Sequence, residues 1–248
     1  MTDAARFDGQ TVLVVGSSRG IGAATARLIH ARGGDVVLHG RAESEPLAAL
    51  AAELGARAVV ADVADRDAVG RAVREVVREG PIHALVNSAG IVRPKPFEEL
   101  TDDDWLEDYR VNVLGPAHFC QAVLPLMRDA GYGRVVNVSS IRGNPSLASF
   151  RGVPYSASKA AVGNLTATLA KAYAPHVLVN CVAPGFTLTD MSDTWSPQMW
   201  ELSTTALAGR AAEASEPAEA IAFLASRAAS FVTGQTVLVD GGYGAAGK

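Results

Sequence analysis

The chain has 248 residues, of which 48% are hydrophobic, and a formal net charge of -4 at pH 7. This length and apolar content suit one α/β domain with a large buried core. The acidic balance excludes nucleic acid and anionic membrane as expected main partners. No apolar stretch is long enough to span a bilayer, and the first residues lack the apolar core of a signal peptide. We therefore expect a cytoplasmic protein.

Short β-branched segments alternate along the chain with longer, Ala-rich segments. We expect strands at 11–15, 36–39, 58–61, 84–87, 134–138, 178–183 and 236–239. We expect helices at 21–32, 65–78, 102 to about 127, 155–173 and 217–225. The expected strands are almost continuously apolar, which is typical of strands buried on both faces. The pattern predicts one α/β domain over 1–248 with a Rossmann fold, a doubly wound seven-stranded parallel sheet with helices on both faces.

The turn after the first expected strand contains three glycines, in the segment Gly16-Ser17-Ser18-Arg19-Gly20-Ile21-Gly22. Without Cβ atoms the chain can turn tightly and approach a pyrophosphate, while the next helix offers free N–H groups and the positive end of its dipole. Three glycines alone are a weak signal, because ordinary turns also use glycine. Their position between an apolar strand and a helix indicates a dinucleotide cradle.

The segment after the second expected strand points to the kind of dinucleotide. NAD-binding folds usually place an acidic residue there to hold the ribose 2′-hydroxyl. Here the first acidic residue is Glu43, and Arg41 stands before it. Arg41 and Arg19 could hold a 2′-phosphate from two sides, unless both are solvated surface arginines. The sequence therefore favours NADP(H), with NAD(H) also possible.

Tyr155 and Lys159 form a Tyr-x-x-x-Lys pair on one face of an expected helix. Carbonyl reduction needs a proton donor, and tyrosine with its pKa of about 10 is a poor acid near neutral pH. A nearby ammonium group lowers such a pKa. Ser140, with Ser139 as the competing candidate, could orient the substrate carbonyl. Because such pairs are common on helices by chance, this one gains meaning from the motifs around it.

With these motifs in this order, the sequence resembles the short-chain dehydrogenase/reductase family, its small single-domain branch, over residues 11 to about 243. Further matches are Asp62-Val63, Asn87-Ser88-Ala89-Gly90, Asn112, and the segment 180–185 with Thr187 and Thr189. Together these patterns give the expected cofactor-binding residues: Gly16, Ser18, Arg19, Gly20, Ile21, Gly22, Arg41, Asp62, Val63, Asn87, Ala89, Gly90, Tyr155, Lys159, Pro184, Gly185, Thr187 and Thr189.

The resemblance also implies catalytic roles for four residues. Tyr155 would donate the proton to the carbonyl oxygen, and Ser140 would steady that oxygen. Lys159 would hold the nicotinamide ribose and lower the Tyr155 pKa. Asn112 would position a water that links Lys159 to solvent. No metal is expected, because the histidines and the two cysteines lack metal-like spacing.

The segment 186–212 is the expected lid over the substrate. Its Trp195 and Trp200 either touch an apolar or aromatic substrate or pack the lid onto the body or a partner subunit. The resemblance further implies a homotetramer, or a dimer, built partly from the helices at 102–127 and 155–173.

These observations predict an NADP(H)-dependent oxidoreductase that interconverts a small-molecule ketone and a secondary alcohol. Many similar proteins are 3-oxoacyl-(acyl carrier protein) reductases, which need basic residues near the pocket for the acidic carrier. The candidates here are Arg128, Arg134, Arg142 and Arg151. The alternatives are an NAD-dependent dehydrogenase of sugars or polyols and a catalytically silent nucleotide-sensing protein. The complete set of four catalytic residues argues against the silent protein.

Overall fold

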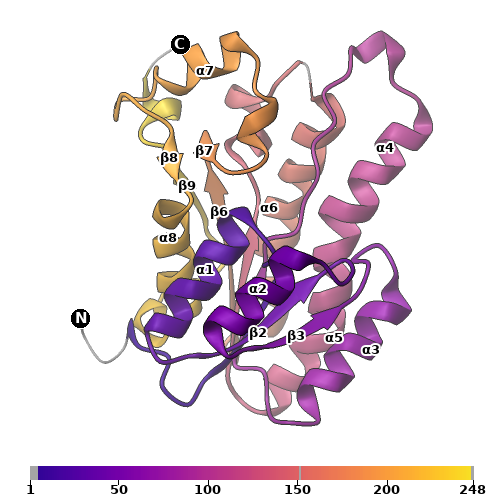
Figure 1. The fold of residues 1–248 in the computed structure, drawn as a ribbon, viewed down its shortest axis with the longest axis vertical. Coiled ribbons are helices and arrows are strands. Elements are labelled where there is room, and N and C mark those ends of the chain that lie inside the picture. The colour runs from indigo at the N-terminus through magenta and orange to yellow at the C-terminus, as the bar shows by residue number, and fades with distance from the viewer. Residues whose placement is uncertain (1–4, 151, 247–248) are drawn as a thin grey trace.

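The computed structural model describes residues 5–150 and 152–246 (Figure 1). Residues 1–4 and 247–248, which the expected domain includes, and the candidate Arg151 lie outside the described residues. The central sheet has seven strands in the order β3-β2-β1-β4-β5-β6-β9, and all its neighbouring strands run parallel. The predicted Rossmann fold with a doubly wound sheet is confirmed.

The strands lie within two residues of the expected positions: β1 Thr11–Val15, β2 Asp35–Gly40, β3 Arg57–Val60, β4 Ala84–Asn87, β5 Gly133–Val138, β6 Val177–Pro184 and β9 Thr236–Val239. The helices are α1 Gly20–Ala31, α2 Glu45–Leu54, α3 Arg66–Val77, α4 Asp102–Tyr109, α5 Gly115–Asp129, α6 Val153–Tyr173, α7 Pro197–Ser203 and α8 Ser215–Ala225. A small sheet pairs β7, Thr187–Leu188, with β8, Ala212–Glu213.

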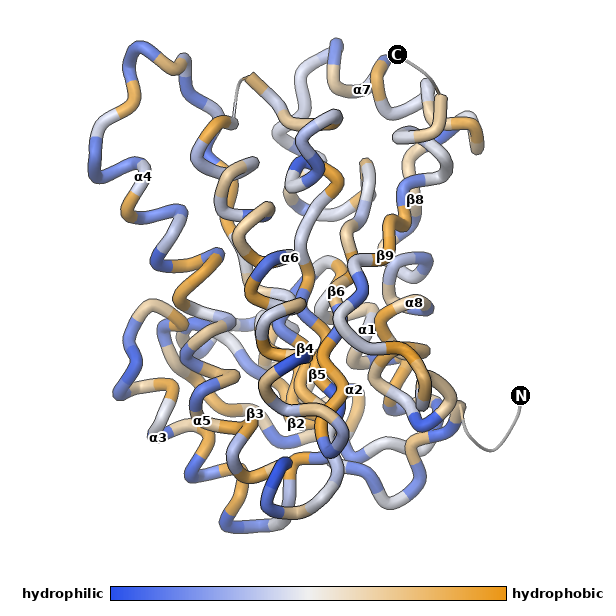
Figure 2. The backbone as a smooth tube through the Cα atoms, turned by 180° about the vertical axis from the view of Figure 1, so that it is seen from behind, coloured by the Kyte–Doolittle hydropathy of each residue, from blue (hydrophilic) through white to orange (hydrophobic). Residues whose placement is uncertain are grey.

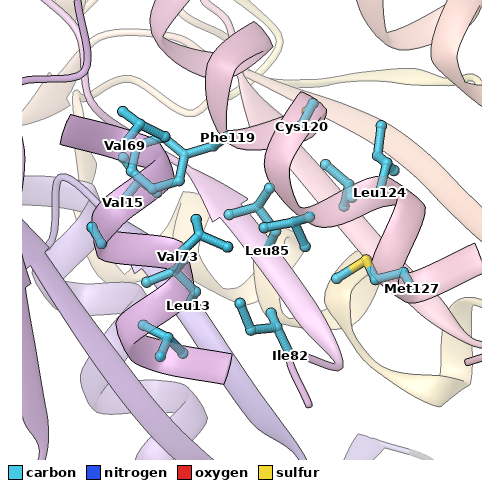
Figure 3. Close-up of a cluster of buried hydrophobic side chains, with 14 of the residues drawn as sticks. Leu13, Val15, Val69, Val73, Ile82, Leu85, Phe119, Cys120, Leu124 and Met127 are labelled. Carbon is cyan, nitrogen blue, oxygen red and sulfur yellow. The ribbon is translucent and has the colours of Figure 1, made fainter. Parts of the chain in front are cut away.

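Two apolar layers hold the helices onto the sheet, because successive strand residues point to opposite faces. On one face, Leu13 and Leu85 of the sheet are in one cluster with Phe119 and Met127 of α5 and with buried valines of α3 (Figure 3). On the other face, Val14 and the neighbouring strand residues pack against α1, α2 and α8. Figure 2 shows these apolar stretches in the middle of the molecule and hydrophilic stretches on its outer turns. Within the described ranges, no helix is both long and apolar enough to cross a membrane.

Strand order places the binding edge of the sheet. The chain moves outward from β1 to β2 and β3, then returns to β4 on the other side of β1. Val15 at the end of β1 is the register partner of Asn87 at the end of β4. The loops that follow these two strands therefore start side by side and diverge, which is where open α/β sheets bind ligands.

The prediction of one regular helix from 102 to about 127 is wrong. A π-helical turn over Arg110–Leu114 separates α4 from α5. A π turn takes an extra residue and often marks a functional position, and this one contains Asn112. Apolar spacing does not reveal the turn, because Asp108 is the one buried residue of α4 and the buried apolar face belongs to α5.

The helix α2 is absent from the expected elements, although its end signals stand in the sequence. Ser44 is the N-cap residue, Pro46 lies in the first turn, and Gly55 ends the helix in the left-handed conformation with φ 58°. Only Leu47 and Leu50 of this helix are buried. That narrow apolar face is why the periodicity alone does not indicate the helix.

Candidate active site

The glycine loop after β1 is packed so closely that two of its glycines have no room for a side chain. A Cβ on Gly16, whose φ is 75°, would lie 2.7 Å from the Cα of Ala89. A Cβ on Gly22 would lie 2.2 Å from the carbonyl oxygen of Gly16. Gly20 lies against the side chain of Thr189, 3.3 Å from where a Cβ would stand. The loop thus contacts both the β4 loop and the expected lid.

This loop leads into α1 with the features that a pyrophosphate needs. Arg19 is the N-cap residue and makes no side-chain capping hydrogen bond, and the first turn holds no acidic residue. The first N–H groups of a helix lack partners within the helix and carry its positive dipole end. Ser18 and Ile21 complete the turn, both partly buried. The residues present therefore fit a dinucleotide phosphate group.

His39 is hydrogen-bonded to the glycine loop, and the sequence patterns assign it no part in the site. It is 1% exposed, and its Nδ1 accepts a hydrogen bond of 3.3 Å from the Gly16 N–H. Its own N–H donates to the hydroxyl of buried Ser17 at 2.8 Å, and its ring meets Phe119 edge-on. Burial lowers the pKa of His39 to about 4, so the ring is neutral at pH 7. The one signal in the sequence is its place at the end of β2.

The two arginines expected to clamp a 2′-phosphate have different surroundings. Arg41 is exposed just after β2 and has no ion pair among the residues that the structure describes. Arg19 reaches across to Asp190 of the expected lid, with 3.6 Å between the charged atoms. Both partners of that pair are largely exposed, so its energy is small. The two-sided clamp stays a prediction.

The Tyr155, Lys159 and Ser140 side chains come together at the end of β5, as expected. The hydroxyl of Ser140 hydrogen-bonds that of Tyr155. The Lys159 ammonium lies 5.6 Å from the centre of the Tyr155 ring and donates to the Val138 carbonyl at 3.0 Å. Ser139 is buried instead, and its hydroxyl donates to the Lys159 main-chain carbonyl at 2.7 Å. This contact makes Ser140 the better candidate for the serine of the site.

Burial acts on the two titratable groups of this cluster in opposite directions. It raises the pKa of Tyr155, although the Ser140 hydrogen bond and the charge of Arg142 lower that pKa. It lowers the pKa of Lys159 to about 8, because the ammonium is the charged form. In this structure the groups that favour the Tyr155 phenolate are thus Ser140 and Arg142, and the expected effect of Lys159 on the Tyr155 pKa stays a prediction.

Asn112 joins the β4 loop to α6. Its side chain is fully buried, accepts from the Ile91 N–H at 2.9 Å and donates to the Ile91 carbonyl at 3.0 Å. It also donates to the Ser158 hydroxyl at 3.1 Å. A Cβ on Gly90 would lie 3.1 Å from the Lys159 Nζ and 3.2 Å from the Asn112 Oδ1. Gly90 therefore brings the β4 loop into direct contact with the candidate catalytic residues.

Asn87 at the end of β4 belongs to a buried polar chain across the sheet. Its amide donates to Asn137 at 2.9 Å, and the Asn137 amide donates to Thr166 of α6 at 2.9 Å. The Asn87 Oδ1 is buried and has no hydrogen-bond partner among the described residues. This series of hydrogen bonds connects β4, β5 and α6.

The remaining expected cofactor residues line the same edge of the sheet. Asp62 is exposed and accepts from the Ala64 N–H at 2.9 Å, while Val63 is buried against Gly115. Pro184 is the last residue of β6. Gly185 lies so close to the backbone of Asp240 that a Cβ on residue 185 would be 2.8 Å from the Asp240 Cα. The Thr187 hydroxyl donates to the Gly185 carbonyl at 3.2 Å.

The segment 186–212 is held together by aromatic rings. Trp195 meets Phe186 at 5.3 Å and Trp200 at 5.0 Å between ring centroids, both edge-on. Phe186 also contacts Tyr243 at 5.3 Å, and the guanidinium of Arg142 lies 5.4 Å from the Phe186 ring centre. The two tryptophans therefore pack the segment internally, and Arg142 connects it to the loop that carries Ser140.

One of the arginines considered for an acidic carrier is buried. Arg134 is 7% exposed, donates to the carbonyl oxygens of Gly133 and Ser226, and lies over the Tyr132 ring. Arg227 lies over the same ring. The prediction that Arg134 is a candidate for binding an acidic carrier is therefore wrong, because its hydrogen-bond donors are directed into the protein.

Comparison with known proteins shows the family of the chain. The family model described as Enoyl-(Acyl carrier protein) reductase matches residues 15–244. Gluconate 5-dehydrogenase of Gluconobacter oxydans is 40% identical over 249 residues, covering 95% of each chain. The 3-oxoacyl-(acyl-carrier-protein) reductase of Haemophilus influenzae is 36% identical over 245 residues, covering 95% of this chain and 98% of that protein.

A solved structure extends the comparison to three dimensions. Gluconate 5-dehydrogenase from Burkholderia cenocepacia, in complex with NADP and tartrate, matches with a TM-score of 0.92 and 36% identity over 98% of both chains. The chain belongs to the short-chain dehydrogenase/reductase family, and it is an oxidoreductase.

The buried neutral His39 predicts a pH dependence of stability. Its pKa falls from 6.5 in the unfolded chain to about 4 in the folded one, so the unfolded state binds more protons between these values. The contribution of His39 is complete above pH 6.5 and is lost as pH falls toward 4, by about 3 kcal/mol. Urea unfolding at pH 7, 5.5 and 4 should show a shallower loss for His39→Asn than for the wild type.

The matched control is His30→Asn, because His30 is exposed. It should leave the pH dependence of unfolding unchanged. Equal slopes for the wild type and both variants would contradict the assignment of a neutral His39.

Proposed function

We propose that the protein interconverts a small-molecule ketone and a secondary alcohol with NADP(H), and that Tyr155 is the proton donor. The observation that carries this proposal is the cluster of Ser140, Tyr155 and Lys159 beside Gly90, at the edge where the glycine loop begins. A protein that only sensed a nucleotide would not need a buried acid hydrogen-bonded to a second hydroxyl. The silent-sensor alternative is therefore disfavoured.

When bound at the glycine loop, NADPH would supply the hydride for the proposed reaction. The Tyr155 hydroxyl donates its proton to the carbonyl oxygen, and the Ser140 hydroxyl holds that oxygen in line. The Lys159 ammonium, anchored on the Val138 carbonyl, keeps positive charge near the phenolate that forms. Asn112 fixes the β4 loop against α6 through Ile91 and Ser158, and so keeps the cluster in place.

NADP(H) is the proposed cofactor over NAD(H). Arg41 is exposed beside the end of β2 without an ion pair among the described residues, so its guanidinium is open to a phosphate. Arg19 stands at the start of α1, where it can exchange its weak pair with Asp190 for the same phosphate. The Burkholderia cenocepacia relative, which contains NADP, supports this choice.

A hydroxylated sugar acid is a second candidate for the substrate class. The gluconate 5-dehydrogenase of Gluconobacter oxydans, at 40% identity, favours it. So does Arg142, whose positive charge acts on Tyr155 and could attract a carboxylate. A panel of a keto-sugar acid, an acetoacetyl thioester, aryl ketones and a quinone would separate this class from carrier-bound and apolar ketones. We propose that residues 186–212 form the lid that selects among them.

We further propose a homotetramer in the cytoplasm, formed partly by α4, α5 and α6. Leu106 of α4, Leu114 at the end of the π turn and Leu126 of α5 are 47%, 45% and 46% exposed. Exposed apolar side chains of this kind suit a surface that a second copy covers. Light scattering should give about four times the mass of 25.7 kDa, and a mass of one chain would contradict the proposal.

Replacing Tyr155 with Phe removes only the proton donor from the cluster. Tyr155→Phe should lower turnover by about a thousandfold or more, because the carbonyl oxygen loses its acid. NADPH absorbance during turnover of the panel measures the loss, and NADPH fluorescence measures cofactor binding, which should stay within about threefold. Retained turnover in this variant would refute the proton-donor role.

Replacing Arg41 tests the cofactor preference. Arg41→Asp should weaken NADPH binding by about tenfold or more and NADH binding much less, because only NADPH places a phosphate there. Fluorescence titration with each cofactor measures both affinities. Arg66→Asp, at an exposed site on α3, makes the same charge change and should leave the ratio of affinities unchanged. Equal losses of affinity for the two cofactors in Arg41→Asp would contradict the proposed role of Arg41 in the preference for NADP(H).

A further inference from the structure

A buried carboxyl group lies beside the candidate catalytic cluster and has no role in the function proposed above. Asp108 is in the last turn of α4, four residues before Asn112, and is 2% exposed. Its Oδ1 is buried and has no hydrogen-bond partner among residues 5–150 and 152–246. The other aspartates of α4 lie at its start, where they favour the positive end of the helix dipole. Asp108 is at the other end of the helix, where the dipole does not favour a negative charge.

The charges around Asp108 come from three elements. Arg93 of the β4 loop and Asp104 on the same helix act on it, and so does Lys159 of α6, the helix against which α4 packs. Arg93 is shared with Glu107, with which its guanidinium pairs. The positive charges of Arg93 and of the buried Lys159 both favour the charged form of Asp108.

The influence is mutual. The negative charge of Asp108 raises the pKa of both Tyr155 and Lys159. Burial in turn raises the pKa of Asp108, because a carboxylate out of contact with water and donors is costly. Burial therefore favours the protonated carboxyl group at Asp108 more than at an exposed aspartate.

The hydrogen-bonding capacity of the two buried groups is complementary. An ammonium group has three donors, and Lys159 uses one of them on the Val138 carbonyl. Asp108 offers acceptors that no described residue occupies. One or two waters between these groups would satisfy both, and buried waters usually occupy such polar sites.

We propose that Asp108 is a positioning residue, which acts on the reaction only through Tyr155. Its carboxyl group exchanges a proton through water with the Tyr155–Lys159 pair. The inference rests on the proposed function. In reduction, the O–H bond of Tyr155 breaks as the substrate O–H bond forms. The Asp108 carboxyl then passes its proton through water to the phenolate and regains one from solvent. In oxidation the same proton moves in the reverse direction, and no other reactant is needed.

Asp108→Asn tests this, because it keeps the shape of the side chain and removes both the charge and the exchangeable acid. The first readout needs no substrate. Tyrosinate absorbance is followed during a pH titration, and the curve of the matching Tyr155→Phe protein is subtracted to isolate Tyr155. The Tyr155 transition should move to lower pH in Asp108→Asn, by about half a unit to one unit, because a nearby negative charge is gone.

The second readout is turnover. In Asp108→Asn the alcohol-oxidation profile should begin at lower pH, since the phenolate forms earlier. Turnover in the reductive direction should fall by about tenfold, with a larger solvent deuterium isotope effect, because proton resupply is slower. Asp103→Asn is the matched control, because Asp103 is an exposed aspartate on the same helix. It should match the wild type in both readouts.

Each outcome decides one of the two proposals. A Tyr155 transition in Asp108→Asn that coincides with the wild type overturns the role of Asp108, and so does an unshifted pH profile with unchanged turnover. A shifted transition without turnover of any carbonyl supports the coupling and counts against the proposed function. If Asp108→Asn does not fold, Asp108→Val removes the same charge from an apolar setting and is read by the same titration.

Discussion

The close approach of Gly16 to Ala89 is the constraint on which the candidate site depends. β1 and β4 are parallel neighbours, and their loops must separate within a few residues. A Cβ at residue 16 would lie 2.7 Å from the Ala89 Cα, so this contact exists only with glycine there. The contact fixes where α1 starts and also where the β4 loop runs. Because Gly90 of that loop touches Lys159 and Asn112, one glycine turn aligns the phosphate cradle with the catalytic cluster.

A second set of contacts fixes α6 at the end of β5. The Ser139 hydroxyl holds the Lys159 carbonyl, and the Lys159 ammonium returns to the Val138 carbonyl. Gly143 passes so close to the Lys159 backbone that a Cβ would lie 2.7 Å away. These contacts bury the start of the helix, and that burial shifts the pKa of Tyr155 upward and that of Lys159 downward. The same packing that positions the two side chains therefore sets their acidity.

Much of this arrangement could be predicted from the sequence, because it depends on patterns that are local in the chain. Apolar strands, the glycine spacing and the Tyr155–Lys159 pair each act within a few residues. The rest depends on contacts distant in sequence. In the π turn, Asn112 hydrogen-bonds Ile91 and Ser158, and apolar spacing does not indicate these contacts. The helix α2 has end signals but a narrow apolar face. The sequence alone predicts that Arg134 is an exposed charge, whereas in the fold it is buried.

Asp108 is not recognisable in the sequence for the same reason, since it follows four other acidic residues of one helix and only packing separates it from them. Once placed, it opposes Arg142: the arginine lowers the pKa of Tyr155 and the aspartate raises it. Reduction requires the protonated phenol, whereas oxidation requires the phenolate. The balance between these two charges therefore helps to set the pH dependence of each direction of the proposed reaction. Substrate charge adds to the same balance, because a carboxylate near Arg142 would remove part of the effect that favours the phenolate.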